Sequence, residues 1–134
     1  MASKILIIDD NPDDIEITKI VLAELGRKEE VIAMLHGRGA LEYLRKGNGH
    51  GNGLPSLILL DLKMPGLSGI DTLRQIRADE QLKHIPVVIV TSSSLTTDEK
   101  EAYAAGADNF LNKAFNIDLF SSNLNVILRR YLTN

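Results

Sequence analysis

Four short apolar runs in this chain each end at, or just before, a charged or hydroxyl-bearing side chain. The runs and these side chains are Ile5–Ile8 with Asp9 and Asp10, Leu57–Leu60 with Asp61, Val87–Val90 with Thr91, and Phe110–Leu111 with Lys113. If folding gathers the carboxylates, two unit charges about 4 Å apart repel by roughly 4 kcal/mol at an effective dielectric near 20. A cluster of this kind holds a proton or binds a cation, and Mg²⁺, which prefers oxygen ligands, is its natural occupant.

The apolar runs predict that these side chains meet. None of the runs alternates polar and apolar residues, which is typical of strands buried on both faces of a parallel sheet. In such a sheet, ligands and chemistry gather beyond the carboxyl ends of the strands, where the order of connection reverses. Taken singly, each aspartate is also explained as a cap, a turn or a strand-end residue. Their shared position favours one crevice that joins Asp9 to Lys113, near the other end of the chain.

Helical patterns separate the strands, so that strand and helix alternate five times. With right-handed crossovers, this alternation predicts an α/β fold, (βα)5, with a doubly wound five-stranded parallel sheet. Asn11 and Pro12 open the first helix, with Ile17, Val21 and Leu25 as its expected buried stripe. The other expected elements are a strand over Glu30–Met34, a short helix over Ala40–Arg45, a helix capped by Ser68, a helix opened by a Thr96–Glu99 capping box, and a last helix from about Ile117 to Leu132.

Composition narrows the class of function. The 134 residues have the length of one domain, and no apolar stretch is long enough to cross a membrane. The net charge of −3 argues against nucleic acid as the main partner, because phosphate binding needs a basic surface. The chain has no cysteine, which excludes a disulfide framework and suits the cytoplasm. We therefore expect a cytoplasmic protein with no membrane and no nucleic-acid partner.

Two further features indicate polar loops or surface and not a site. The glycine-rich segment Gly47–Gly53 matches neither nucleotide-binding pattern and precedes a strand instead of following one, so a flexible loop is expected. The three histidines, His36, His50 and His84, are scattered without the spacing of metal ligands. Neither feature competes with the carboxylate cluster as the functional centre.

The charged and hydroxyl-bearing side chains singled out above lie within four longer motifs. These are Lys4–Asn11 (KILIIDDN), Leu57–Gly69 (LILLDLKMPGLSG), Pro86–Ser92 (PVVIVTS) and Ala105–Lys113 (AGADNFLNK). In this combination and order they resemble the response-regulator receiver domains of two-component signalling, CheY-like in size and plan. The resemblance covers essentially the whole chain. It implies the flavodoxin-like strand order 2-1-3-4-5 and a single receiver domain over residues 1–134 with no output domain.

The resemblance implies a role for each reactive side chain. By it, Asp61 is the phosphoacceptor and becomes a 4-aspartylphosphate. The other implied roles are Mg²⁺ binding by Asp9, Asp10, Asp61 and the main-chain carbonyl of Lys63, phosphate contact by Lys113, and a conformational switch through Thr91 and Phe110. The donor, a phosphohistidine or a small acyl phosphate, brings the chemical energy. The chain then promotes only its own phosphorylation and dephosphorylation and is not an enzyme acting on other molecules.

The resemblance also indicates partners. A sensor histidine kinase or a phosphotransfer protein would supply the phosphoryl group, and a downstream protein would receive the signal. The glycine-rich insertion before the third strand is similar to that of single-domain regulators that partner phytochrome-type or other sensor histidine kinases. On the last helix, Leu119 and Val126 lie roughly opposite the core stripe. They are either isolated exposed residues or part of a docking or homodimer surface.

Three positions depart from the usual receiver pattern. Ala114 stands where a proline commonly follows the lysine through a cis bond, and a cis bond at a non-proline residue costs about 3 to 4 kcal/mol. The Lys113–Ala114 peptide is therefore expected to be strained, or trans with a less well placed lysine. Phe110 lacks the hydroxyl of a common tyrosine, and Lys63 places a cation two residues after Asp61.

These departures leave two other functions to weigh against a phosphorylated receiver. One is a receiver-like interaction module without regulated phosphorylation, which Ala114 makes conceivable and the intact acidic set disfavours. The other is an aspartate-nucleophile phosphatase on a related α/β plan. It is disfavoured because such enzymes need a second aspartate where this chain has Lys63.

Overall fold

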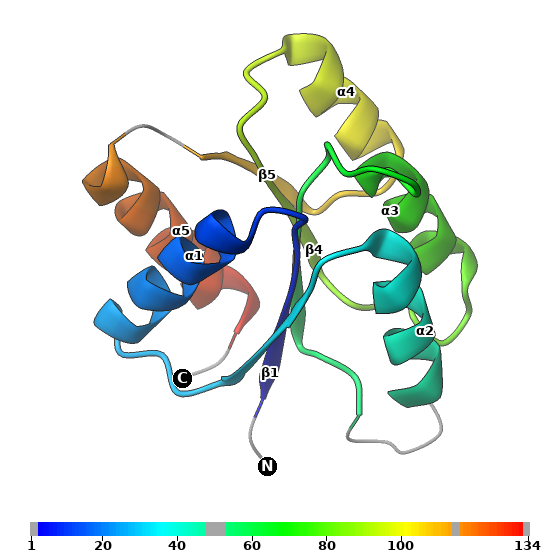
Figure 1. Cartoon of the computed structure of the whole chain (residues 1–134), viewed down its shortest axis with the longest axis horizontal. Coiled ribbons are helices and arrows are strands. Elements are labelled where there is room, and N and C mark those ends of the chain that lie inside the picture. The colour runs from blue at the N-terminus through cyan, green and yellow to red at the C-terminus, as the bar shows by residue number, and fades with distance from the viewer. Residues whose placement is uncertain (1–2, 48–52, 114–115, 133–134) are drawn as a thin grey trace.

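Strands and helices alternate along the chain in the computed structural model, which describes residues 3–47, 53–113 and 116–132 (Figure 1). The elements are β1 (Lys4–Ile8), α1 (Pro12–Glu24), β2 (Glu30–Met34), α2 (Gly37–Gly47), β3 (Leu57–Leu60), α3 (Gly69–Ala78), β4 (Val87–Thr91), α4 (Thr96–Ala104), β5 (Asn109–Asn112) and α5 (Ile117–Tyr131). The alternation confirms the α/β fold predicted from the sequence.

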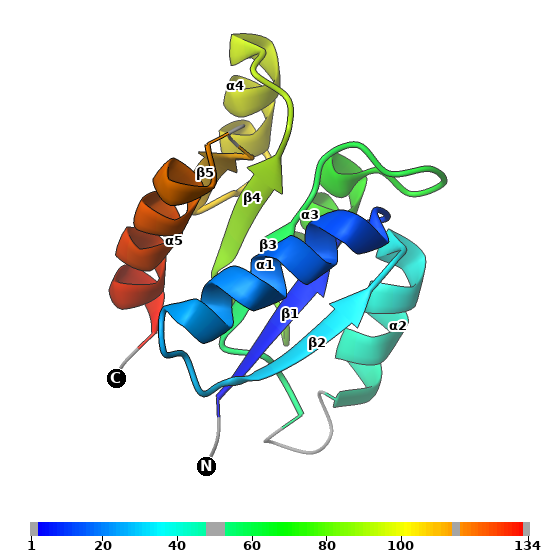
Figure 2. The same cartoon turned by 60° about the vertical axis from the view of Figure 1, so that its left-hand side comes forward.

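The five strands form one parallel sheet in the order β2-β1-β3-β4-β5, as predicted. Helices α1 and α5 cover one face, and α2, α3 and α4 cover the other (Figures 1 and 2). The order of connection reverses between β1 and β3, which are neighbours because Ile8 pairs with Leu60. The carboxyl ends of these two strands therefore lie at the switch point of the sheet, where ligands bind in folds of this kind.

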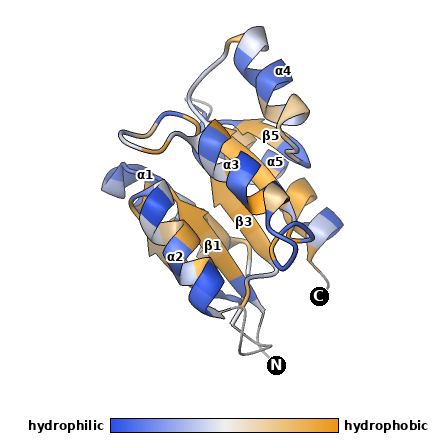
Figure 3. Cartoon of the chain, turned by 90° about the vertical axis from the view of Figure 1, so that its right-hand side faces the viewer, coloured by the Kyte–Doolittle hydropathy of each residue, from blue (hydrophilic) through white to orange (hydrophobic). Residues whose placement is uncertain are grey.

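Alternate residues of the central strands pack into two separate cores. Leu6 and Ile58 belong to the core under α2, α3 and α4, whereas Ile7 and Leu59 belong to the core under α1 and α5. In Figure 3 the labelled strands β1 and β3 are apolar, and α2 and α3 carry hydrophilic residues on the side that faces the viewer. Burial on both faces explains why the strand sequences are unbroken apolar runs.

Side chains cap α1 and α3 as the sequence predicts. The Asn11 side chain accepts hydrogen bonds from the backbone N–H groups of Asp13 and Asp14, and the Ser68 side chain accepts one from Asp71. Each cap satisfies backbone donors that the first helical turn leaves without a partner. The caps therefore determine where both helices leave the carboxyl edge of the sheet.

The buried face of α1 differs from the predicted one. Val21 is fully buried, but Ile17 is 42% exposed, and Ile15 and Leu22 are buried in its place. The helix carries two overlapping apolar stripes, and its spacing alone does not say which of them meets the sheet. The packed stripe is rotated from the predicted one, which leaves Ile17 at the surface between α1 and α5.

The start of α4 also differs from the prediction. Leu95 occupies the N-cap position without a side-chain cap, and Thr96 is already the first helical residue. The Ser93 hydroxyl instead donates to the Asp98 carboxylate and accepts from the Leu95 N–H. The predicted Thr96–Glu99 capping box is therefore wrong, because a serine before the helix holds its first turn.

Helix α2 begins three residues before the predicted Ala40. It starts at Gly37, where a Cβ atom would lie 2.2 Å from the Thr72 hydroxyl oxygen of α3, so glycine allows the two helices to approach. The strand predicted over Phe110–Leu111 extends by one residue at each end. Residues 48–52 of the glycine-rich segment lie outside the described residues.

Arg77, in the last turn of α3, connects three segments at the edge of the sheet opposite the aspartates. Its guanidinium donates to the carbonyl oxygens of Ile85 and Gly106 at 2.8 Å and to the Asp108 carboxylate at 2.7 Å. The same carboxylate accepts from the Val87 N–H at 2.8 Å. These bonds tie α3 to the amino-terminal ends of β4 and β5.

We predict that Arg77→Ala lowers the free energy of unfolding by about 2 to 3 kcal/mol, because several hydrogen bonds to a largely buried charge are lost together. Urea denaturation measures the change. Arg74→Ala is the matched control on the same helix, since Arg74 and its partner Asp71 are both more than half exposed. The control should change stability by less than about 0.5 kcal/mol. Equal losses in the two variants would contradict the assigned role of Arg77.

Candidate functional site

Three aspartates meet at the carboxyl ends of β1 and β3. Asp9 and Asp10 follow β1, and Asp61 follows β3. The two strands are paired as far as Ile8 and Leu60, and the Asp61 N–H donates to the Ile8 carbonyl oxygen at 2.9 Å. One carboxylate oxygen from each aspartate lies within 4.8 Å of the others. The structure thus brings together the three acidic residues that the sequence analysis singled out.

The ammonium group of Lys113 lies among carboxylates. Its Nζ donates to Asp9 at 2.6 Å, to Asp14 at 2.9 Å and to Asp61 at 3.4 Å. The backbone helps to place it, because the Lys113 N–H donates to the Thr91 carbonyl oxygen at 2.7 Å. Burial alone would lower the pKa of Lys113, but the bonds to Asp9 and Asp14 and the attraction of Asp61 raise that pKa above its ordinary value. Lys113 is therefore charged at neutral pH.

Asp14 is a member of this cluster that the sequence analysis did not single out. It lies in the first turn of α1, beside Asp13, and Asn11 caps the backbone N–H groups of both. The sequence does contain a signal for it, because an acidic residue in the first turn of the helix that follows Asp9 and Asp10 is a candidate member of the site. This signal applies equally to Asp13 and Asp14, however. Only the rotation of the folded helix brings Asp14 to Lys113.

The acidic cluster has the properties of a cation site. Burial raises the pKa of the Asp9 carboxyl, although hydrogen bonds from Lys113 and the Asn11 N–H act in the opposite direction. Asp61 Oδ1 is buried and has no hydrogen-bond partner among the described residues. Buried polar atoms are normally satisfied, so this oxygen points to a partner of another kind. An all-oxygen donor set with an unsatisfied carboxylate oxygen fits a hard divalent cation.

Two glycines shape the loop that follows Asp61. Gly66 has a φ of +75°, a conformation that favours glycine. A Cβ atom at Gly69 would lie 2.1 Å from the Asp61 carbonyl oxygen. Because Gly69 has no side chain, α3 can begin directly against the backbone of Asp61. The loop therefore folds back tightly behind the acidic cluster.

Side chains of the same loop alternate between core and solvent. Leu62 and Met64 are buried in the core under α2, α3 and α4. Lys63, between them, is exposed, and its ammonium lies 3.6 Å from the Asp98 carboxylate of α4. The Lys63 side chain is thus directed to α4, in an exposed ion pair that adds little stability.

Thr91 and Phe110 lie on neighbouring strands beside the site. Thr91 is fully buried at the end of β4, and its hydroxyl oxygen accepts a long hydrogen bond of 3.4 Å from the Ser93 N–H. Phe110 on β5 is half-buried and lines a cavity of about 370 Å³, together with Ser93 and Asn112. The strand register pairs Phe110 with Ile89, two residues before Thr91. The aromatic ring therefore has open space next to the strand that carries the threonine.

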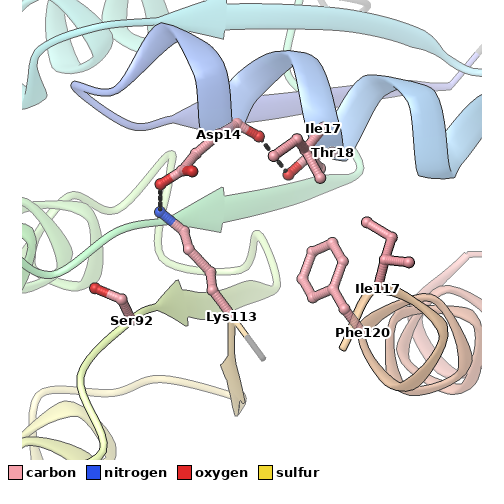
Figure 4. A pocket seen from close by; sticks show the side chains of 7 residues that line it. All are labelled: Asp14, Ile17, Thr18, Ser92, Lys113, Ile117 and Phe120. Carbon is pink, nitrogen blue, oxygen red and sulfur yellow. Dashed lines mark hydrogen bonds and ion pairs between the residues drawn. The ribbon is translucent and has the colours of Figure 1, made fainter. Parts of the chain in front are cut away.

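A cavity of about 290 Å³ opens between α1 and α5 beside Lys113 (Figure 4). Ile17 from α1 and Ile117 and Phe120 from α5 form its apolar wall. The ion pair between Asp14 and Lys113 lies on its border with the acidic cluster. A molecule or a partner's side chain that enters this cavity from solvent would contact that ion pair.

The remaining predicted positions lie away from the acidic cluster or outside the described residues. Leu119 and Val126 are exposed on α5, at 52% and 65%. Ala114 lies outside the described residues, so the strain expected at the Lys113–Ala114 peptide stays a prediction. Within the described ranges, no helix combines the length and the apolar character needed to cross a membrane.

Comparison with protein-family models matches residues 5–125 to the response regulator receiver domain. The chain belongs to this family. The receiver is 36% identical over 127 residues to the chemotaxis protein CheY of Pseudomonas aeruginosa, an alignment that covers 95% of this chain and 97% of CheY. Receiver domains are signalling modules of two-component systems and not enzymes that act on other substrates.

Solved receiver structures share the fold over nearly the whole chain. The phosphorylated cyanobacterial phytochrome response regulator RcpA has a TM-score of 0.87 and 30% identity, over 99% of this receiver and 96% of RcpA. The Mn²⁺-bound form of the response regulator Rcp1 has a TM-score of 0.84 and 28% identity, over 98% of this receiver and 96% of Rcp1. The similarity to CheY, RcpA and Rcp1 therefore covers nearly the whole of this receiver and nearly the whole of each of these proteins.

We predict that Asp10→Asn stabilises the receiver in EDTA by about 1 kcal/mol. The Asp10 carboxylate has no ion pair among the described residues and lies close to the carboxylates of Asp9 and Asp61. Two like charges about 4 Å apart repel by about 1 kcal/mol in a water-like dielectric, and removing the Asp10 charge relieves this repulsion. The same substitution should reduce the rise in melting temperature that excess MgCl₂ produces, because a cation ligand is lost. Thermal unfolding in EDTA and in MgCl₂ measures both effects.

Asp13→Asn is the control for this prediction. It removes an equal charge from an exposed residue nearby and should leave the response to MgCl₂ intact. An Asp10→Asn protein that MgCl₂ stabilised as much as the parent would contradict a ligand role for Asp10.

Proposed function

We propose that this receiver is a two-component phosphorelay response regulator that accepts a phosphoryl group on Asp61 from a sensor histidine kinase in a Mg²⁺-dependent reaction. The observation that carries the proposal is the Asp61 carboxylate. Its Oδ1 is buried and has no hydrogen-bond partner in the part of the chain that the structure describes, its Oδ2 lies 3.4 Å from the Lys113 ammonium, and the oxygens of Asp9 and Asp10 lie close by. This combination suits a nucleophile whose new ligand is a phosphoryl group.

In the proposed reaction an Asp61 oxygen forms a bond to phosphorus while the bond from phosphorus to the donor's histidine nitrogen breaks. A high-energy donor of this kind requires no general base from the receiver. The donor supplies the chemical energy, and the receiver contributes position and charge stabilisation. Catalysis is limited to the receiver's own phosphorylation and dephosphorylation.

Asp9, Asp10, Asp61 and the main-chain carbonyl of Lys63 would hold Mg²⁺. When bound, the ion would neutralise charge on the oxygens of the transferring group. The all-oxygen donor set and the unsatisfied Asp61 oxygen support this assignment. The response regulator Rcp1, which shares this fold, has a Mn²⁺-bound form, and this supports divalent-cation binding by the receiver.

Lys113, Thr91 and Phe110 respond to the new phosphoryl group. The Lys113 ammonium contacts its oxygens, the Thr91 hydroxyl turns toward it, and the Phe110 ring moves in the space that borders β5. A shift of the population from 1:99 to 99:1 needs about 5.5 kcal/mol of differential stabilisation. One hydroxyl does not supply this alone, so partner binding shares it.

The proposed partners are a sensor histidine kinase or phosphotransfer protein and a downstream target, in the cytoplasm. The similarity to RcpA, a phytochrome response regulator, favours a phytochrome-type kinase. Leu119 and Val126 would belong to a homodimer or docking surface formed by α4, β5 and α5, because both are exposed apolar residues on α5.

We predict that Asp61→Asn abolishes phosphorylation. After incubation with acetyl phosphate and MgCl₂, mass spectrometry should detect a hydroxylamine-labile phosphoryl group on the parent and none on the variant. Asp71→Asn is the matched control, since it removes the same charge from an exposed residue of α3 and should be phosphorylated like the parent.

Two results would overturn the assignment. A labile, Mg²⁺-dependent phosphoryl group on Asp61→Asn would place the acceptor elsewhere. A parent protein that accepts no phosphoryl group from acetyl phosphate or from a kinase would favour the alternative, an interaction module without regulated phosphorylation.

We further predict that a double variant, Leu119→Asp with Val126→Asp, weakens self-association of the beryllofluoride-treated receiver. Charged side chains on the proposed surface would repel their symmetry mates. Light scattering of treated and untreated samples measures the effect. Ile20→Asp is the control, because Ile20 is 56% exposed on α1, outside the proposed surface. Unchanged self-association in the double variant would exclude this surface as the homodimer interface.

A further inference from the structure

Lys113 divides its hydrogen bonds among three carboxylates that are not equivalent. A lysine ammonium has three N–H donors, and here they point to Asp9, Asp14 and Asp61 at 2.6, 2.9 and 3.4 Å. Asp9 and Asp61 belong to the proposed metal set, whereas Asp14 does not. One of the three partners of Lys113 is therefore independent of the metal.

A divalent cation in the acidic cluster would change the surroundings of Lys113. It would occupy oxygens of Asp9 and Asp61, and its positive charge would repel the ammonium. Asp14 is the one described partner of Lys113 that lies outside the proposed metal set, so both of its oxygens would stay available to the lysine. The ion pair between Asp14 and Lys113 thus becomes more important when the metal is present.

We propose that Asp14 is a positioning residue that holds the Lys113 ammonium beside Asp61 when the metal site is loaded. This inference rests on the proposed function and deepens it, since it names the residue that keeps the lysine in place against cation repulsion. Asp14 acts through Lys113 and touches neither the metal nor the phosphoryl group.

The local structure suits this role. The Asn11 side chain accepts from the Asp14 N–H at 3.3 Å, and the Thr18 hydroxyl donates to the Asp14 carbonyl oxygen at 3.0 Å, so the backbone of Asp14 is held within the first turn of α1. The Lys113 side chain is 14% exposed and that of Asp14 is 32% exposed. This ion pair is therefore less screened by water than an ordinary surface pair. Figure 4 shows the two side chains facing each other at the border of the cavity.

The first test observes Lys113 without any phosphorylation. Lysine ¹⁵Nζ NMR spectra, in which Lys113→Ala assigns the signal, report whether the ammonium is held in slow exchange. We expect the parent to keep this signal when MgCl₂ is added and Asp14→Asn to lose it in MgCl₂. Asp13→Asn, which removes the same charge one residue earlier in the chain, should behave like the parent. A signal retained by Asp14→Asn in MgCl₂, or lost by the parent, would overturn the inference.

The second test is a double-mutant cycle on the initial rate of phosphorylation by acetyl phosphate at saturating MgCl₂. Asp14→Asn should slow the reaction about tenfold, as for the loss of one charge-assisted hydrogen bond, and Asp14→Glu should restore most of the rate. In a Lys113→Ala background, Asp14→Asn should cause no further loss. Thermal unfolding confirms that each variant is folded.

The outcomes separate this inference from the proposed function. An equal loss from Asp14→Asn in both backgrounds, or no loss in either, would overturn the positioning role. If the parent accepts no phosphoryl group, the proposed function fails, and the NMR experiment alone decides whether Asp14 holds Lys113 in the presence of Mg²⁺.

Discussion

The site depends on one electrostatic interaction, the contact of the Lys113 ammonium with the carboxylates of Asp9, Asp14 and Asp61. A parallel sheet necessarily brings the carboxyl ends of β1 and β3 together, and with them acidic groups that repel each other. Removing charges from water is costly unless they are paired, so a positively charged side chain is needed at the same place. Lys113 supplies it. This lysine follows β5, two strands away from β3, and its backbone N–H donates to the Thr91 carbonyl oxygen.

The surroundings of this contact differ in how tightly they are packed. Behind Asp61, Gly69 lets α3 pack directly against the backbone, and both faces of the central strands are buried. On the side of α4 and β5, a cavity borders Phe110, and a serine outside α4 holds its first turn. The acidic cluster is therefore closely packed behind Asp61, whereas cavities lie on the side of α4 and β5 and between α1 and α5.

Prediction from sequence succeeded where a pattern has one structural solution. Short unbroken apolar runs are typical of strands buried on both faces, as β1, β3 and β4 are, and Asn11 and Ser68 are strong caps with N–H groups directly after them. It failed where a pattern allows two solutions. Helix α1 has overlapping apolar stripes, so its spacing predicts Ile17 in the core although Ile17 is exposed. Thr96 had the spacing of a capping box, but a serine before the helix holds the turn instead.

The sequence by itself determined which reactive groups stand at the strand ends, because strand length and order leave Asp9, Asp61 and Lys113 at one edge of the sheet. Only the tertiary structure decided how these groups are paired. Asp13 and Asp14 are alike in the sequence, and the rotation of α1 against the sheet makes Asp14 the partner of Lys113. The same packing buries one Asp61 oxygen that has no hydrogen-bond partner among the residues that the structure describes. Both outcomes depend on contacts between distant segments, which local patterns of residues do not encode.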